Sequence, residues 1–331
     1  MKQRPKPSFV FKGAEFLALF LIGCYAFSFG ASYHYYADTL RNFVFQYALG
    51  SLILALFFCF SKRWRWFTLM VCVFFVTGFE YFSNLSRPSL YASEASTTLK
   101  VAIYNRNYGI RVHDDFIAWL QEERPDVVAL QESQSTHQKA MEQLKDLYPY
   151  QITEPREHAF GLILASRFPV LNSKIVPTTT IARPEYVIEN FYLHADIKFR
   201  EDIVVSLYTA HPAPPVTRFI HQQRNRDLSI ISDAIKRDHS GNVIFMGDMN
   251  ITPFSPYFAQ FINRSGLRNE YTGALIIPTW PSDFINIICQ IPIDHILHKG
   301  NLRLVSKYRG AALGSDHYPL VAVYAFDTSQ M

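Results

Sequence analysis

Three long apolar segments near the N-terminus restrict most strongly how this chain folds. They read FLALFLIGCYAFSFGA from Phe16, FVFQYALGSLILALFFCF from Phe43 and WFTLMVCVFFVTGFEYF from Trp66. Each approaches the roughly 17 to 20 residues that a helix needs to cross a bilayer. Their near-absence of charge and their aromatic ends favour contact with lipid. We therefore predict a transmembrane module over residues 1–82, with about three helices near residues 14–33, 43–60 and 65–82.

Two alternatives remain open for these segments. The first segment also fits a secretory signal peptide, because basic residues precede it and small residues follow. Cleavage would nevertheless leave the other two segments in the chain. Those two segments alternatively form a pair of buried helices in a soluble protein.

Charge is distributed unevenly along the chain. Residues 1–88 carry nine Lys and Arg against three acidic residues, whereas the remainder carries 23 basic and 25 acidic residues. The chain's pI of 8.7 therefore reflects the membrane flanks and gives no argument for nucleic-acid binding. Cys289 is the only cysteine beyond the apolar segments, which excludes an internal disulfide there. Residues 83–98 have the composition of a linker.

Basic residues also predict an orientation. Four Lys and Arg precede the first apolar segment and three lie at residues 61–66, whereas the intervening loop carries only Arg41. Because cytoplasmic loops are enriched in Lys and Arg, we expect the N-terminus and residues 61–66 in the cytoplasm. Three crossings then place the chain after residue 88 outside. The third segment is short and contains Glu80; if it only lies on the membrane surface, the soluble domain is cytoplasmic.

The soluble part, residues 99–327, contains more strands than a simple βαβ chain. Apolar patterns predict helices at residues 113–123 and 136–148, at about 215–236 and near 256–263. Strands are predicted at residues 99–105, 126–132, 160–166, 174–180, 186–199, 202–211, 242–250, 293–299, 302–309 and 317–326. Mixed strands with helices at intervals predict two packed sheets flanked by helices.

Polar residues follow or precede these strands at recurring positions. They are Asn105, Asn107, Glu132, His211, Asp248, Asn250, Asp294, Asp316 and His317. Ligands and catalytic groups collect at such ends, so we expect these residues to converge on one rim. Each alone also has a structural explanation, such as a turn for Gly-Asp-x-Asn or a cap for Ser-Asp. For His295 the favoured interpretation is a hydrogen-bonded strand histidine.

The ordered motifs YN, LQE, TAHP, GDMN, IDHIL and GSDHYPL resemble those of the endonuclease/exonuclease/phosphatase superfamily, over about residues 99–326. This superfamily includes DNase I-like nucleases, AP endonucleases, sphingomyelinases and inositol polyphosphate 5-phosphatases. The resemblance implies a four-layer αββα sandwich (DNase I-like) and metal-dependent hydrolysis of phosphoesters. With its N-terminal module, the chain looks like bacterial membrane-tethered members. We therefore expect an integral protein of a bacterial inner membrane with a periplasmic catalytic domain.

The resemblance also implies residue roles. Glu132 supplies a hard oxygen ligand suited to Mg²⁺, with Mn²⁺ as an alternative. Asn105 completes the primary metal site, and Asp316 is a further metal-side carboxylate. Asp248 orients or deprotonates the attacking water, and Asn250 holds the phosphate or that water. The residues expected at the phosphate are His317, with Asp294 fixing its tautomer, and His211.

Some positions depart from the better-known branches or stay ambiguous. Asn107 stands where many nucleases have Asp, which puts a second metal in doubt. Trp280, in PTWP, resembles a late Trp-containing loop of the family, although a core position is equally compatible. The candidate substrate-binding residues are Asn107, Trp280 and Arg218. Candidate phosphate clamps are arginines 106, 156, 218 and 224. For each of them a solvated surface position is the more expected one.

The sequence leaves the substrate class open. Extracytoplasmic nucleic acid and a phospholipid headgroup, as for a sphingomyelinase-like lipid phosphodiesterase, are both compatible with the motifs. A different class of function is a catalytically inactive, membrane-anchored binding module of the same fold. That alternative predicts loss of an essential polar residue, and none of the family's motif residues is missing. No protein partner is indicated.

Overall fold

The protein's structure is a computed structural model that describes residues 9–87, 97–109, 114–183, 186–283 and 287–326. Most of the predicted linker, residues 88–96, lies outside the described residues. The chain divides into two compact units. The helical unit comprises residues 1–84 and 253–256, and the α/β unit comprises residues 85–252 and 257–331.

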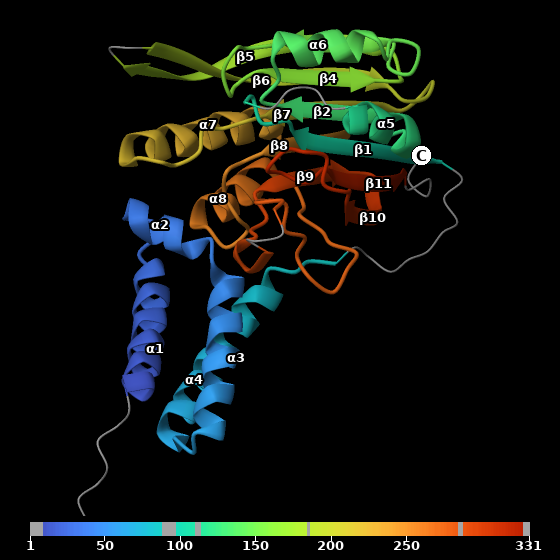
Figure 1. The fold of residues 1–331 in the computed structure, drawn as a ribbon. Helices are drawn as coiled ribbons and strands as arrows, with labels where there is room; N and C mark the ends of the chain where they lie inside the picture. Colours follow the sequence, from blue (N-terminus) through green and yellow to red (C-terminus); the bar gives the residue numbers. More distant parts are fainter. Residues whose placement is uncertain (1–8, 88–96, 110–113, 184–185, 284–286, 327–331) are drawn as a thin grey trace, which may run out of the picture. The chain divides into compact units, whose positions relative to one another are not determined.

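The helical unit contains α1 (Phe9–Ser28), α2 (Tyr35–Arg41), α3 (Val44–Phe60) and α4 (Trp64–Ser83), drawn in blue in Figure 1. By length and composition α1 and α4 could each cross a membrane. The pair α2 and α3, bent by 64°, adds a third crossing only if it forms one span. Phe16 and Phe79 are 67% and 78% exposed, and exposed apolar side chains on such helices suit contact with lipid. The expected number of three crossings stays a prediction.

The α/β unit is built on two sheets. The six-stranded sheet has the order β10-β11-β1-β2-β4-β3 and the five-stranded sheet has the order β5-β6-β7-β8-β9. The first contains β1 (Thr98–Asn105), β2 (Val127–Gln131), β3 (Tyr150–Glu154), β4 (Leu162–Ser166), β10 (Leu302–Arg309) and β11 (Leu320–Phe326). The second contains β5 (Val170–Arg183), β6 (Tyr186–Lys198), β7 (Val204–Ala210), β8 (Asn242–Asp248) and β9 (Asp294–Gly300).

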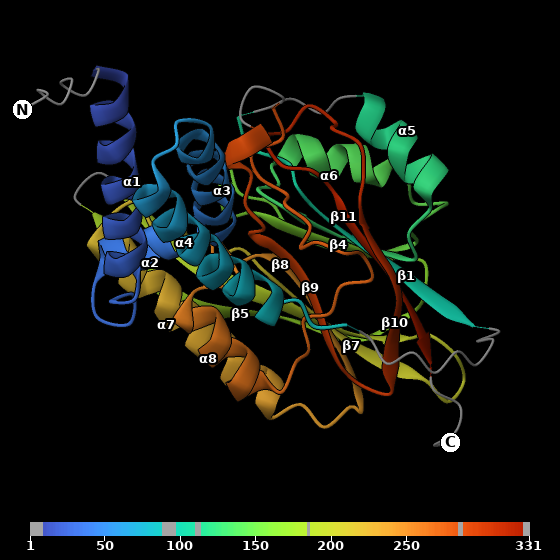
Figure 2. The same cartoon turned by 90° about the horizontal axis from the view of Figure 1, so that it is seen from below.

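Four layers result from how the strands distribute their side chains. In β1, Leu99, Val101 and Ile103 pack between the two sheets, whereas Ala102 and Tyr104 pack on the opposite face. That face is covered by α5 (Asp114–Glu123) and α6 (Ser135–Glu142). The outer face of the other sheet is covered by α7 (Arg218–Lys236) and α8 (Pro256–Ser265), as Figures 1 and 2 show. The predicted αββα sandwich is confirmed.

Strand pairing brings the predicted polar positions together at one end of the strands in the two sheets. The parallel pairs β1/β2 and β7/β8 end together, with Asn105 opposite Gln131 and Ala210 opposite Gly247. Antiparallel β9 begins at that end, with Asp294 opposite Asp248. Antiparallel β11 likewise begins beside the end of β1. Gly247 is required there, because a Cβ atom on it would lie 2.4 Å from the carbonyl oxygen of Ala210.

Three local differences from the predicted elements have simple causes. Strand β3 was not predicted, because its residues are only half-buried and lack an apolar alternation. Helix α6 ends at Glu142, six residues earlier than predicted, and turns follow it. Strand β5 extends beyond residues 174–180 in both directions because it pairs with β6 along most of its length. A short 3₁₀ helix, η1 (Ile287–Cys289), precedes β9.

Candidate functional site

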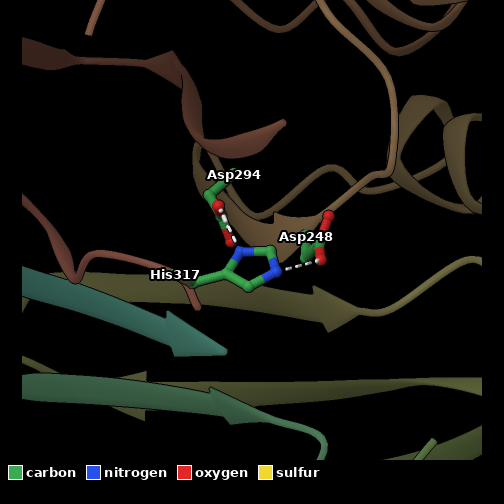
Figure 3. A group of neighbouring side chains, drawn as sticks. All are labelled: Asp248, Asp294 and His317. Atoms are coloured by element: carbon green, nitrogen blue, oxygen red, sulfur yellow. Dashed lines mark hydrogen bonds and ion pairs between the residues drawn. The ribbon is translucent and has the colours of Figure 1, made fainter. Parts of the chain in front are cut away.

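A histidine held between two aspartates lies at the centre of the converging strand ends. His317 Nδ1 is 2.9 Å from Asp294 Oδ2, and His317 Nε2 is 3.7 Å from Asp248 Oδ2. Figure 3 shows the imidazole ring between the two carboxylates. All three side chains are buried. Paired on both ring nitrogens, His317 is held in one orientation, as a group that handles protons or anionic charge requires.

Asn105 connects this group to a second carboxylate. Its Nδ2 atom donates to Asp248 Oδ2 at 2.9 Å and to Glu132 Oε1 at 3.1 Å. Asn105 ends β1 and Glu132 follows β2, whereas Asp248 ends β8 in the other sheet. The amide therefore joins the two sheets at the site. Glu132 Oε2 also accepts a hydrogen bond of 3.0 Å from the backbone N–H of Tyr108.

His211 lies against the same two carboxylates from the end of β7. Its Nε2 atom is 3.5 Å from Asp248 Oδ2 and 3.7 Å from Glu132 Oε1. Its Nδ1 atom is 2.9 Å from the carbonyl oxygen of Ala159, and the Phe160 ring stacks on the imidazole at 5.5 Å. The imidazole is thus fixed from behind and presents Nε2 to the carboxylates.

Asn250 is held in an unusual backbone conformation beside His211. Its φ of 50° lies in the left-handed region, as do those of Glu132 and Asn107, both 54°. Such conformations cost free energy for residues other than glycine and gather at functional sites. The Asn250 N–H donates to Asp248 Oδ1 at 2.9 Å, and its Nδ2 donates to the carbonyl oxygen of Pro212 at 3.0 Å. These bonds orient Asp248 as well as Asn250.

Burial and charge together shift the pKa values of the central residues. Burial alone would raise the pKa of Asp248, but the hydrogen bond to His211 and the charge of His317 outweigh it and lower the pKa to about 2. Burial would lower the pKa of His317, but the charge and hydrogen bond of Asp294 outweigh it and raise the pKa to about 10. The pKa of His211 is likewise raised, against its burial, mainly by Asp248. The two shifts favour the charged forms at neutral pH, an anionic Asp248 and a cationic His317.

Asp294 differs from Asp248 in the direction in which the pKa of its carboxyl is shifted. Burial raises the pKa of the Asp294 carboxyl, and the hydrogen bond from His317 opposes this shift. The backbone N–H of Asp294 donates to Thr279 Oγ1 at 3.2 Å, which fixes the start of β9.

Asp316 forms the outer side of the site with Asn107 and Trp280. Asp316 Oδ1 accepts from Asn107 Nδ2 at 2.8 Å, and Oδ2 accepts from Trp280 Nε1 at 2.9 Å. The centroid of the Trp280 ring is 6.5 Å from that of His317. Trp280 is thus neither a buried core residue nor fully exposed. Arg218, the first residue of α7, is exposed and forms no hydrogen bond or ion pair with the other predicted site residues that the structure describes.

Two groups of residues offer metal-binding atoms. Asp248, Asp294 and His317 each provide one ligand atom within 4.8 Å of the others, although His317 is already bonded to Asp294. Glu132 and Asn105 provide the second group. Across the described parts of the chain, no Lys or Arg pairs with Glu132, and its side chain is 15% exposed. A partly accessible carboxylate whose nearest basic group is an imidazole, rather than Lys or Arg, is the kind of hard ligand that Mg²⁺ or Mn²⁺ takes.

The prediction that the four arginines are surface residues is wrong for Arg106 and Arg224. Both are fully buried, at 1% and 0% exposure. Arg106 packs against the rings of Tyr104 and Phe116, and Arg224 Nη1 donates to the carbonyl oxygen of Asn250 at 2.9 Å. No sequence signal distinguished them from exposed arginines. The interpretation of His295 is confirmed, since the buried ring lies 2.8 Å from the carbonyl oxygen of Ile251.

Comparison with protein families gives one match. Residues 106–317 match the sequence model of the Endonuclease/Exonuclease/phosphatase family. The matched range contains nearly all of the predicted site residues, including the last, His317. A search of curated proteins finds no match.

Solved structures share the fold of the α/β unit. TDP2 from D. rerio, complexed with single strand DNA product, is 17% identical, with a TM-score of 0.58 over 69% of this chain and 99% of the other. A family protein from Bacteroides thetaiotaomicron is 16% identical, with a TM-score of 0.55 over 70% and 98% of the two chains. The human Nocturnin catalytic domain with bound sulfate is 16% identical, with a TM-score of 0.53 over 70% and 95%. At such identities the likeness shows the fold alone.

Proposed function

The chain belongs to the endonuclease/exonuclease/phosphatase family, and we propose that it is a membrane-anchored, divalent-metal-dependent hydrolase of phosphoester bonds. The observation that carries this proposal is the contact of Asn105 with both Glu132 and Asp248. That contact places an accessible carboxylate for a metal beside a buried, anionic carboxylate suited to activating water. Phosphoester hydrolysis requires both a metal ligand and a group that activates water, and the two proposed residues lie together at one end of the strands.

Glu132 and Asn105 would hold Mg²⁺ or Mn²⁺, with Asp316 as a further carboxylate on that side. A divalent cation bound there supplies neutralisation of charge on the phosphoryl oxygens. Asn105 Oδ1, the oxygen that suits a hard cation, accepts from the backbone N–H of Asn107. Asn107 in turn bonds to Asp316. The proposed metal-side residues therefore form one connected set.

Asp248 is the proposed group that orients the attacking water or accepts its proton. Its low pKa keeps it anionic at neutral pH, and its bonds to Asn105 and Asn250 fix the direction of its two oxygens. A fixed, anionic carboxylate aligns a water without reorganising during the reaction. Asn250 then contacts either that water or the phosphate.

His317 and His211 are proposed to contact the phosphate that is cleaved. The raised pKa of His317 keeps its imidazole cationic at neutral pH, and a cationic donor stabilises the negative charge that develops on a phosphoryl oxygen. Asp294, bonded to Nδ1, fixes the ring so that Nε2 faces the reaction. His211 adds a second imidazole, whose Nε2 lies 3.5 Å from the same oxygen of Asp248, Oδ2.

The substrate is proposed to be either nucleic acid or a phospholipid headgroup. The D. rerio TDP2 structure contains a single strand DNA product, which favours nucleic acid for this fold. The near balance of basic and acidic residues after residue 88 gives no electrostatic support for a polyanion. Membrane anchorage through α1 and α4 brings phospholipids within reach, and we place the site in the periplasm from the distribution of basic residues.

Substrate hydrolysis by the full-length protein in detergent tests the proposal. We expect Mg²⁺-dependent turnover of bis-p-nitrophenyl phosphate, with plasmid DNA and sphingomyelin separating the two substrate classes. Glu132→Ala should abolish Mg²⁺-dependent turnover, whereas Glu157→Ala, at an exposed glutamate, should not change it. A wild-type rate for Glu132→Ala would overturn the metal assignment. A folded protein that hydrolyses no phosphoester would instead support the binding module.

A reporter fused after Met331 tests the proposed orientation. In bacterial cells, alkaline phosphatase is active only in the periplasm, so we expect activity from that fusion. A reporter that is active only in the cytoplasm can be fused there instead. Activity of that fusion would show that the catalytic domain faces the cytoplasm.

A further inference from the structure

A fully buried arginine on α7 contacts the backbone of Asn250. Arg224 is 0% exposed, and its Nη1 donates to the carbonyl oxygen of Asn250 at 2.9 Å. Its Nε and Nη2 atoms both donate to Asn225 Oδ1, at 2.9 and 2.7 Å. The guanidinium also lies over the Tyr257 ring, 5.9 Å from the centroid. Burial of a permanently charged side chain is costly, so this contact has a purpose beyond filling space.

The geometry requires a guanidinium rather than an ammonium group. Asn225 holds one edge of the planar guanidinium through Nε and Nη2. The remaining nitrogen, Nη1, is thereby directed at Asn250. Lysine has a single flexible donor atom and cannot be clamped on one edge while donating from the other.

Asn250 depends on such an anchor because its backbone is strained. The φ of 50° is unfavourable for asparagine compared with the ordinary helical and extended regions. Polar contacts hold it there: its N–H bonds to Asp248, its Nδ2 bonds to Pro212 and lies 3.1 Å from His211 Nε2, and its carbonyl accepts from Arg224. Without the arginine, the peptide after Asn250 can rotate and the residue can relax to a negative φ. That relaxation would displace the N–H that orients Asp248 Oδ1.

We propose that Arg224 is a positioning residue that fixes Asn250, and through it Asp248, in the geometry needed for hydrolysis. This inference rests on the proposed function, since it gives Arg224 a role in that same reaction. Arg224 reaches the site at the backbone carbonyl of Asn250. It acts through that carbonyl.

Kinetics of the full-length protein with bis-p-nitrophenyl phosphate test the proposal. Arg224→Lys and Arg224→Gln should lower kcat about 10- to 100-fold, the effect of displacing a reacting group by a fraction of an ångström to 1 Å. KM should change by less than about twofold, because substrate-contacting groups remain. Arg226 lies on the same helix and is exposed, so Arg226→Lys and Arg226→Gln are matched controls that should keep kcat.

Variants of Asn225 test the clamp while leaving the arginine in place. Asn225→Ala removes the acceptor that holds Nε and Nη2 and should lower kcat. Asn225→Asp keeps an oxygen there and should restore most of it. Equal rates for these two variants would count against the clamp and therefore against the inference.

A double substitution separates positioning from a general structural role. If Arg224 acts through Asn250 and Asp248, adding Arg224→Gln to the double variant Asn250→Ala/Asp248→Ala should lower kcat no further than that double variant alone. Effects that multiply would overturn the inference. A crystal structure of Arg224→Lys gives a test that needs no activity: a positive φ at Asn250 with its contacts to Asp248, Pro212 and His211 intact would also overturn it. Absence of turnover in the wild-type protein would contradict the proposed function and leave that structural test decisive for Arg224.

Discussion

Asn105 donates a 2.9 Å hydrogen bond to Asp248 although 143 residues separate them in the chain, and this bond joins the two sheets at the site. The same amide nitrogen also donates to Glu132. Two carboxylates that would otherwise repel each other therefore share one donor. Asn105 therefore links the position of Asp248 to that of the proposed metal ligand.

Replacing Asn105 with alanine should consequently disturb both carboxylates at once. Asn105→Ala removes the shared donor and a proposed metal ligand, so we expect kcat to fall about 100-fold or more and the Mg²⁺ concentration for half-maximal activity to rise. Mg²⁺ titrations of phosphodiesterase activity measure both changes. Asn301→Ala, in the turn between β9 and β10, is the control and should leave both values unchanged. An unchanged Mg²⁺ requirement for Asn105→Ala would show that Asn105 does not bind the metal.

The paired aspartate should control the alkaline side of the pH profile. Asp294 is the main cause of the raised pKa of His317, about 10, so the cationic imidazole should persist well above its ordinary pKa of about 6.5. A raised pKa means that the stabilisation of the folded state is complete below about pH 6.5 and is lost as the pH rises towards 10. Asp294→Asn should therefore lower the pKa of His317 and move the alkaline decline of kcat/KM to lower pH.

Rate measurements between pH 6 and 10 check this expectation. The comparison variant is Asp283→Asn, because Asp283 lies on the loop after Trp280 and outside the predicted site. Identical alkaline limbs for the wild-type protein and Asp294→Asn would mean that the imidazolium of His317 is not required for turnover.

A second histidine should limit stability in acid. Burial lowers the pKa of His295 to about 4, so the unfolded chain binds a proton between about pH 6.5 and 4 that the folded protein does not. The free energy of unfolding should therefore decrease as the pH falls through that range, by about 3 kcal/mol in total for this residue. Unfolding by denaturant, followed by tryptophan fluorescence at several pH values, measures the slope.

His295→Gln should flatten that slope, because it removes the titrating group. His239→Gln provides the control, since His239 is exposed at the end of α7. Should His295→Gln retain the full acid sensitivity, the decrease in stability must come from other groups.

The sequence predicted the fold and the rim of the site because both depend on local pattern. Strands buried on both faces, such as β2, are continuous apolar runs, and polar residues directly after such runs are visible without a structure. Strand β3 lacked that signal because it is a half-buried edge strand. The burial of Arg224 also had no sequence signal, because the burial of a helical arginine depends on which residues pack against the helix. Distant partners, such as the Asn250 carbonyl that accepts from Arg224, leave no trace in spacing.

For Asp316, the sequence motif and the contacts in the structure lead to different expected roles. As a metal-side carboxylate, Asp316 should affect the Mg²⁺ requirement. Both of its oxygens, however, accept hydrogen bonds from Asn107 and Trp280, an arrangement that orients the indole beside His317. We therefore expect Asp316→Asn to raise KM severalfold, since an amide can accept on only one side, with a smaller effect on Mg²⁺ activation. Trp280→Phe keeps an aromatic ring but removes the indole N–H, so it should reproduce the change in KM without altering the Mg²⁺ requirement. If Asp316→Asn instead raises the Mg²⁺ requirement tenfold and Trp280→Phe has no effect, Asp316 binds the metal directly and its contact with Trp280 is incidental.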